Sequence, residues 1–153
     1  MNKTALLALA AALGGCSLLM PKDPISSRVS SEVARSEQLS LESHTLSSLA
    51  AIERSLNDYI RAKKGIPGKL DLLLPEYLAE IPAVVTGVPM HRDSSRVSYY
   101  NADTIQGGQV DGARIDDTGG WGYVYNDRQV IIFVDCTHKT LSGGLWYQMR
   151  GVY

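Results

Sequence analysis

An apolar helical repeat in the middle of the chain, closed by a sharp stop, most constrains how this sequence can fold. Large apolar side chains recur there at three- and four-residue steps and so share one helix face. These positions are Leu46, Leu49, Ile52, Leu56, Tyr59 and Ile60. The basic residues at 61, 63 and 64 suit the C-terminal end of a helix dipole, Gly65 can adopt the left-handed cap, and Pro67 prevents continuation. The pattern predicts a helix that ends just before Gly65.

Short apolar strands separated by turn residues follow this helix in the C-terminal half. The candidates are residues 97–100, 122–125, 130–134 and 145–149, and the second and third are joined by the turn sequence at 126–129. Sequential hairpins of this kind favour an antiparallel sheet. The expected fold class is therefore α+β, with one long N-terminal helix packed on a small antiparallel sheet of about four strands.

The N-terminus has the composition of a secretion signal. A basic residue at position 3 precedes an apolar run that ends at Leu13, which is too short for the ~20 residues needed to span a bilayer. Leu13-Gly14-Gly15-Cys16 resembles a bacterial lipobox. The resemblance implies that residues 1–15 are a lipoprotein signal peptide and that acylated Cys16 anchors the protein in a membrane. An ordinary secretory signal with an incidental cysteine is the alternative.

A serine-rich segment separates this signal from the predicted helix. Ten of the 32 residues from Ser17 to Ser48 are serine, so the segment buries little. We expect a tether over residues 16–40, with some helical character at Val29 and Val33, and a globular domain over residues 41–153. Serine rather than aspartate after the cysteine implies sorting to the outer membrane of a Gram-negative envelope, facing either the periplasm or the surface.

Three motifs resemble the heads of type IV pilins and type II secretion pseudopilins. They are "KGIPGKLDLLLPEYLAEIPAV" at 64–84, "DTGGWGYVY" at 117–125 and "VDCTHKTLSGGLWYQM" at 134–149. The last two together are similar to the C-terminal chains of split pilins, in which helix and head are separate polypeptides. The chain departs from the family because Pro21 and Pro24 end its apolar run, so it lacks the long apolar helix half with which pilins begin.

The resemblance implies a structural or assembly component associated with a type IV pilus or a type II secretion system. Pilins, pseudopilins or secretion-system proteins would be its partners. A membrane-tethered periplasmic or surface binding module unrelated to filaments, with or without calcium dependence, is the alternative. Fifteen basic and sixteen acidic residues give a net charge of −1 without a long basic run, so nucleic acid is not an expected partner.

Cys136 and His138 are the residues best suited to chemistry, because positions two apart on a strand share a face. A catalytic Cys-His pair needs a third orienting group, and a zinc site needs two further ligands, for which His44 and His91 have no supporting spacing. We therefore expect a non-enzymatic protein in which Cys136 is a packed thiol and His138 a polar residue at a strand end. An intermolecular disulfide through Cys136 is the alternative.

Two further groups are candidates for binding. We expect the aspartates of the loop before residue 121 to be solvated and no cofactor to bind, although major pseudopilins carry calcium in a comparable loop. Asp116 and Asp117 are the ligand candidates if calcium binds here. Trp121, Tyr123, Trp146 and Tyr147 would form a partner-binding surface if exposed, since aromatic residues dominate interface hot spots. We expect a mixture of core and surface roles, with Trp121 structural.

Overall fold

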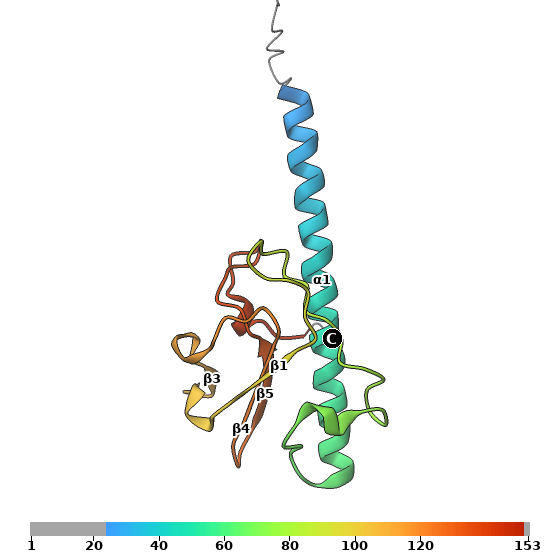
Figure 1. Ribbon diagram of the computed structural model, residues 1–153, viewed down its shortest axis with the longest axis vertical. Helices are drawn as coiled ribbons and strands as arrows, with labels where there is room; N and C mark the ends of the chain where they lie inside the picture. The colour runs from blue at the N-terminus through green and yellow to red at the C-terminus, as the bar shows by residue number, and fades with distance from the viewer. Residues whose placement is uncertain (1–23, 152–153) are drawn as a thin grey trace, which may run out of the picture.

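The computed structural model describes residues 24–151, and its dominant feature is one long helix, α1, from Pro24 to Lys63. The sheets lie beside the C-terminal half of α1, and the N-terminal half projects beyond them (Figure 1). The rest of the described chain contains five short strands and four 3₁₀ helices. The expected α+β class is confirmed, with small sheets of three and two strands.

The C-terminal end of α1 lies where the sequence predicts it, but the cap differs. Lys64, rather than Gly65, takes the left-handed conformation, with φ 58°. Its N–H donates to the carbonyl of Ile60 (2.9 Å), which satisfies one of the carbonyls left open at a helix end.

The N-terminal end of α1 lies far before the predicted start of the apolar repeat. The expected tether, residues 16–40, is helical from Pro24 onward. Proline is compatible with the first turn, where its missing N–H has no helical partner in any case. Serine hydroxyls bond back within the helix, as Ser30 does to the carbonyl of Ser26 (2.7 Å). The signal peptide and Cys16 lie outside the described residues.

The main sheet has three strands in the order β1-β4-β5. β1 is Val97–Tyr100, β4 is Trp121–Tyr125 and β5 is Val130–Val134, in close agreement with three of the four predicted strands. β4 and β5 form the predicted antiparallel hairpin, and Asn126 closes its turn with both backbone and side-chain hydrogen bonds. β4 is therefore the central strand, and β5 lies at the edge.

The prediction of a wholly antiparallel sheet is wrong, because β1 pairs with β4 in parallel. Parallel neighbours need a long crossover connection, and residues 101–120 supply it. That connection folds into its own small hairpin, in which β2 (Ile105–Gln106) pairs with β3 (Gln109–Val110).

The predicted strand at 145–149 is also wrong, because Trp146–Gln148 forms a 3₁₀ helix. Only one isolated bridge, between Lys139 and Leu145, remains of the expected pairing in the described chain. The N–H groups of Gln148 and Met149 donate to the carbonyls of Leu145 and Trp146, so the backbone bonds locally instead of joining a strand ladder. Trp146 packs in the core beside α1, and Tyr147 packs against the cluster on the other sheet face.

The sheet is buried on both faces. On the face toward α1, helix residues pack against Trp121 and Tyr123 of β4 and the alternate residues of β5. On the opposite face, Val124 and Phe133 pack under the 101–120 connection. This two-sided burial explains why β4 and β5 are apolar at nearly every position.

Polar side chains of α1 tie it to two loops of the head. Thr45 Oγ1 accepts from the backbone N–H of Val85 and donates to its carbonyl, both at 2.8 Å. Gln38 Nε2 donates to the carbonyl of Thr86 (2.6 Å), and Glu42 Oε1 accepts from the N–H of Leu141 (2.7 Å).

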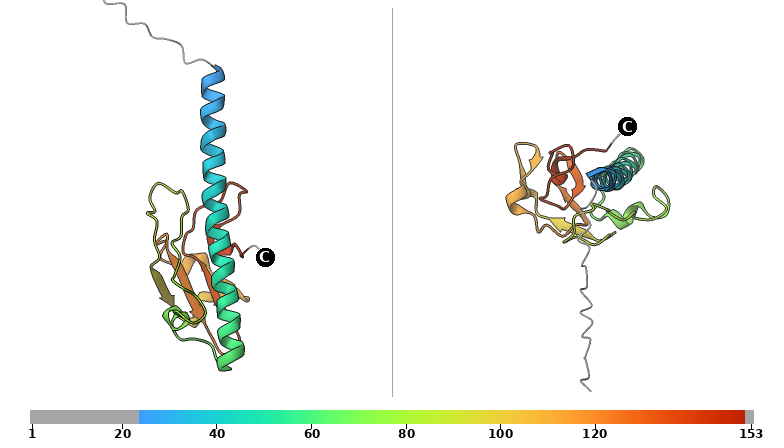
Figure 2. Two further views of the ribbon diagram at one scale, coloured as in Figure 1. Left: turned by 90° about the vertical axis from the view of Figure 1, so that its right-hand side faces the viewer. Right: turned by 90° about the horizontal axis from the view of Figure 1, so that it is seen from above.

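Gln38 marks the limit of the packed part of α1. All side chains from residue 25 to residue 37 are exposed. We call residues 25–37 the stalk and residues 38–151 the head; the left view of Figure 2 shows the stalk projecting beyond the head. Within residues 24–151, no helix combines the length and the apolar character needed to cross a membrane.

Candidate metal centre

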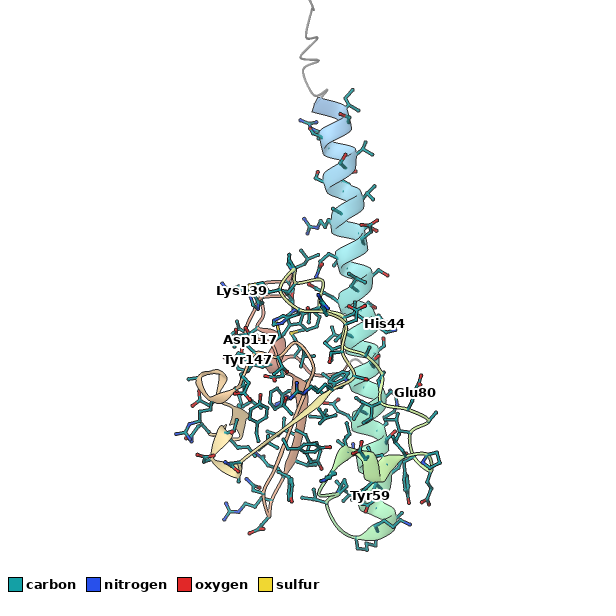
Figure 3. The ribbon with its side chains drawn as sticks, viewed as in Figure 1. His44, Tyr59, Glu80, Asp117, Lys139 and Tyr147 are labelled. Atoms are coloured by element: carbon teal, nitrogen blue, oxygen red, sulfur yellow. The ribbon has the colours of Figure 1, made fainter. Side chains whose placement is uncertain are left out.

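Four side chains with metal-ligating atoms meet at the end of the head from which the stalk projects. They are His91, Asp117, Cys136 and His138, and their ligand atoms all lie within 4.8 Å of one another. Figure 3 shows Asp117 close to Lys139 at this end of the head. Three chain segments supply the group: the turn after Val88, the loop before β4 and the residues that follow β5. We call it the His-Cys-Asp cluster.

The donor atoms of the cluster are close in pairs. His91 Nε2 lies 3.3 Å from Asp117 Oδ1, and His138 Nδ1 lies 3.7 Å from the same oxygen. The Sγ of Cys136 lies 3.6 Å from His138 Nδ1. The two imidazole rings meet edge to face, with centroids 5.1 Å apart and planes at 85°. One carboxylate, one thiol and two ring nitrogens therefore point at a common space.

A buried carboxylate holds the Asp117 loop in place. Asp135, which is fully buried, accepts from the N–H of Asp117 through Oδ1 and from the N–H of Thr118 through Oδ2. Asp117 itself has φ 56°, and its Oδ1 accepts from the N–H of Thr137 (2.7 Å). These bonds orient the Asp117 carboxylate toward the two histidines.

His91 is fixed by its own turn and by a glycine. Its N–H donates to the carbonyl of Val88 (2.9 Å). The ring lies against Gly119, where an added Cβ would come within 2.6 Å of the ring and where φ is +75°. Only glycine fits both demands at position 119. The His91 side chain is 7% exposed, and its Nε2 has no hydrogen-bond partner among the described residues.

Without a bound metal, the electrostatics of the cluster favour a protonated Cys136 thiol and an ionised Asp117 carboxylate. Burial raises the pKa of the Cys136 thiol to about 11; the negative charges of Asp117 and Asp135 add to this, and a backbone hydrogen bond at His138 opposes it. Burial also acts to raise the pKa of Asp117, but hydrogen bonds from Thr137 and the two histidines outweigh it, so that pKa lies below its ordinary value.

This arrangement differs from a nucleophilic Cys-His-Asp relay. In a relay the thiol and the carboxylate contact opposite nitrogens of one imidazole. Here Cys136 and Asp117 both face Nδ1 of His138. The thiol is also fully buried, whereas a reactive cysteine is partly exposed and carries a lowered pKa. The cluster is a group that can hold a metal ion.

Sequence reasoning found part of this cluster. Cys136 and His138 do lie side by side, and Asp117 is one of the two aspartates predicted as calcium candidates. Asp116 is exposed and takes no part in the cluster, so the two aspartates do not act as a pair. His91 was missed because no sequence spacing links it to the other three residues.

Burial also decides two other predictions. Cys136 is fully buried and therefore not placed to form a disulfide with another chain. Trp121, Tyr123 and Trp146 are at most 1% exposed, so these three do not supply the partner surface that depended on their exposure, and Trp121 is structural as expected. They fill the core between α1 and the sheet, and Trp121 Nε1 donates to the carbonyl of Pro82 (2.7 Å).

Tyr147 is the one member of that aromatic group with a partly exposed side chain. It packs over Gly112, where an added Cβ would lie 2.5 Å from the tyrosine Cζ. Among residues 24–151, the large aromatic side chains exposed by more than two fifths are Tyr99 and Tyr125.

No protein-family model, curated protein or solved structure gives a significant match to the chain. The pilin-like resemblance is thus carried by the sequence motifs at 64–84, 117–125 and 134–149.

Proposed function

We propose that this chain is a non-enzymatic envelope lipoprotein with a pseudopilin-like head, and that it acts as an assembly component beside a type IV pilus or type II secretion machine. The observation that carries the proposal is the stalk. It extends α1 beyond the head by about 20 Å, at 1.5 Å per residue, with every side chain exposed. A helix built in this way offers its surface to a partner.

One side of the stalk has an apolar stripe suited to a partner helix. Ile25, Val29 and Val33 follow one another at four-residue steps and are 75%, 54% and 51% exposed. β-Branched residues have low helix propensity, and a free helical extension of this length is marginal in water. Packing against a second apolar helix would stabilise the stalk and bury the stripe. The occupant we propose is the helix of a pilin or pseudopilin.

An acyl anchor completes this arrangement. Cys16 precedes α1, so lipid attached to it would hold the stalk between the membrane and the head. Ser17, directly after the lipidated cysteine, favours sorting of the lipoprotein to the outer membrane. The head would then stand off the membrane by at least the length of the stalk. Replacement of Cys16 by alanine should release the protein from the membrane fraction and change its electrophoretic mobility.

Site-specific photocrosslinking in the native cell tests the stalk. A crosslinker at Val29 should capture a pilin, pseudopilin or secretion-system protein, and one at Leu72, which is 53% exposed on the head, should not. The double change Val29→Glu and Val33→Glu places charge in the proposed helix contact. With the crosslinker moved to Ile25, this variant should no longer capture the partner that the unchanged stalk captures. Head stability should change by no more than about 0.5 kcal/mol, since these residues are exposed.

Two outcomes would contradict the proposal. Crosslinks from Leu72 alone would indicate a binding module that uses the head and is unrelated to filaments. Capture from Val29 that survives both glutamate substitutions would show that the apolar stripe is not the contact.

A further inference from the structure

We propose that the His-Cys-Asp cluster is a structural zinc site, a property independent of the filament role. Two imidazole nitrogens, one thiol sulfur and one carboxylate oxygen form the donor set. Calcium prefers six to eight oxygen ligands, and magnesium an octahedron rich in water. Nitrogen and sulfur donors in a set of four are those of zinc.

The donor spacing matches a tetrahedron around one ion. Zinc bonds of about 2.0–2.3 Å place nitrogen and oxygen donors about 3.3 Å apart and sulfur and nitrogen about 3.6 Å apart. The pair His91 Nε2–Asp117 Oδ1 is at 3.3 Å, and the pair Cys136 Sγ–His138 Nδ1 is at 3.6 Å. The third short pair, between His138 and Asp117, is at 3.7 Å. All six separations are within 4.8 Å, so small side-chain rotations close the shell.

The buried state of His91 is a second, independent observation. Its side chain is more than nine-tenths buried, and Nε2 points into the cluster without a hydrogen-bond partner among residues 24–151. A buried ring nitrogen without a well-aligned hydrogen bond is unfavourable, even with the Asp117 carboxylate oxygen 3.3 Å away. Coordination to a metal ion satisfies that nitrogen, and Gly119 leaves the room that keeps the ring in place.

The charges balance when zinc binds. The Cys136 thiol gives its proton to solvent and coordinates as thiolate, while Asp117 is already ionised and both histidines bind as neutral rings. One divalent cation with one thiolate and one carboxylate gives a site with no net charge. Such a site suits a position where Cys136 is fully buried and Asp117 is 31% exposed.

Four protein ligands leave no open position, which is the pattern of structural rather than catalytic zinc. The ion would add a covalent connection between three segments that are otherwise held by hydrogen bonds and apolar packing. One of them, the 84–94 loop closed by the Val84–Ser94 bridge, also contacts α1 through Thr45 and Gln38. Zinc would therefore fix the loop on which the base of the stalk rests.

The test uses the full chain, first for metal content and then with cobalt. We expect about one zinc per chain after purification without chelator. Cobalt in the emptied protein should give a thiolate-to-metal charge-transfer band and the intense visible bands of tetrahedral coordination. Cys136→Ser should remove the charge-transfer band and weaken zinc binding by more than about 100-fold, since loss of a second-shell partner alone costs about 10–100-fold.

Matched controls separate the site from general metal binding. Asp117→Asn should weaken zinc binding, and Asp116→Asn, at the exposed neighbour, should leave it unchanged. His91→Gln and His44→Gln form a second pair, because His44 is exposed on α1 away from the cluster. If Cys136→Ser does not fold, as judged by circular dichroism, the partly exposed His138→Gln takes its place and should remove the tetrahedral spectrum.

Three results would overturn the zinc site. They are a wild-type cobalt spectrum without a thiolate band, a band that persists in Cys136→Ser, and equal losses of affinity in Asp117→Asn and Asp116→Asn. Amide exchange tests the structural role: chelation should speed exchange over residues 84–94 and leave β5 unchanged. Metal binding without any change in that loop would refute the structural role.

Discussion

Asp135 offers the sharpest test of how the head is held together, because this fully buried carboxylate is the acceptor for a whole loop. Oδ1 accepts from the N–H of Asp117 (3.2 Å), and Oδ2 accepts from Thr118 and from the hydroxyl of Tyr100 (2.7 Å). Every neighbour is a donor. Asp135→Asn keeps the shape of the side chain but replaces one acceptor oxygen with an NH₂ group.

The expected loss of stability in Asp135→Asn is worked out for the amide orientation that loses fewer hydrogen bonds. With the NH₂ group on the Oδ1 side, only the bond from Asp117 is lost, and the Tyr100 and Thr118 bonds become neutral. A hydrogen bond to a charged group contributes about 1.5–3 kcal/mol, and an unsatisfied buried donor costs about 1–3 kcal/mol. The free energy of unfolding should therefore fall by about 3 kcal/mol, and Tm by about 10 °C for a chain of this size.

Urea unfolding, followed by the fluorescence of the two buried tryptophans, measures this change. Chelator in every sample removes any contribution from bound metal. Asp116→Asn is the matched control and should shift the free energy of unfolding by no more than about 0.5 kcal/mol, because that side chain is exposed. A double-mutant cycle with Tyr100→Phe should give a coupling energy of about 1 kcal/mol or more. A loss below about 1 kcal/mol for Asp135→Asn, or strict additivity with Tyr100→Phe, would refute the reasoning.

Two further substitutions probe the packing around the sheet and the helix. Gly122→Ala should lower the free energy of unfolding by about 1–3 kcal/mol, because the added Cβ would lie 2.2 Å from Phe133 Cζ. The control, Gly65→Ala, adds a Cβ with no described atom within 4 Å and should destabilise the head less. Equal urea midpoints for the two variants would contradict this prediction. Glu42→Ala should speed amide exchange at Leu141, because it removes the acceptor of that N–H at 2.7 Å. Glu42→Gln keeps an acceptor oxygen and should largely preserve the protection of Leu141. Equal exchange rates at Leu141 in the two variants would show that this hydrogen bond contributes nothing.

Much of the local structure was predictable because its determinants lie within a few residues of each other. The 97–100 and 130–134 strands match β1 and β5, and the turn at Asn126 was found from its turn residues. The C-terminal end of α1 followed from the basic last turn and the Gly65–Pro67 stop. Pro24 also suits a helix start, but the density of serines concealed it.

The pairing of segments was not predictable from such local signals. The choice between parallel and antiparallel pairing of β1 with β4 depends on where residues 101–120 pack, and that is settled by burial of the second sheet face. The composition around Trp146 and Tyr147 predicts a strand. They form a 3₁₀ turn in which the N–H groups of Gln148 and Met149 bond to the carbonyls three residues earlier, and this local bonding replaces a strand ladder.

The sequence by itself determined the C-terminal part of the helix, its stop, three strands, one hairpin and the neighbourhood of Cys136 and His138. Only the tertiary structure decided that His91 and Asp117 join them, because the bridge at Val84 and the buried carboxylate of Asp135 bring distant loops to one point. Helix capping, turn formation and side-chain periodicity depend on residues a few positions apart, so the local sequence predicts them. Convergence of three loops depends on the packing of the whole head, so no local sequence pattern predicts it.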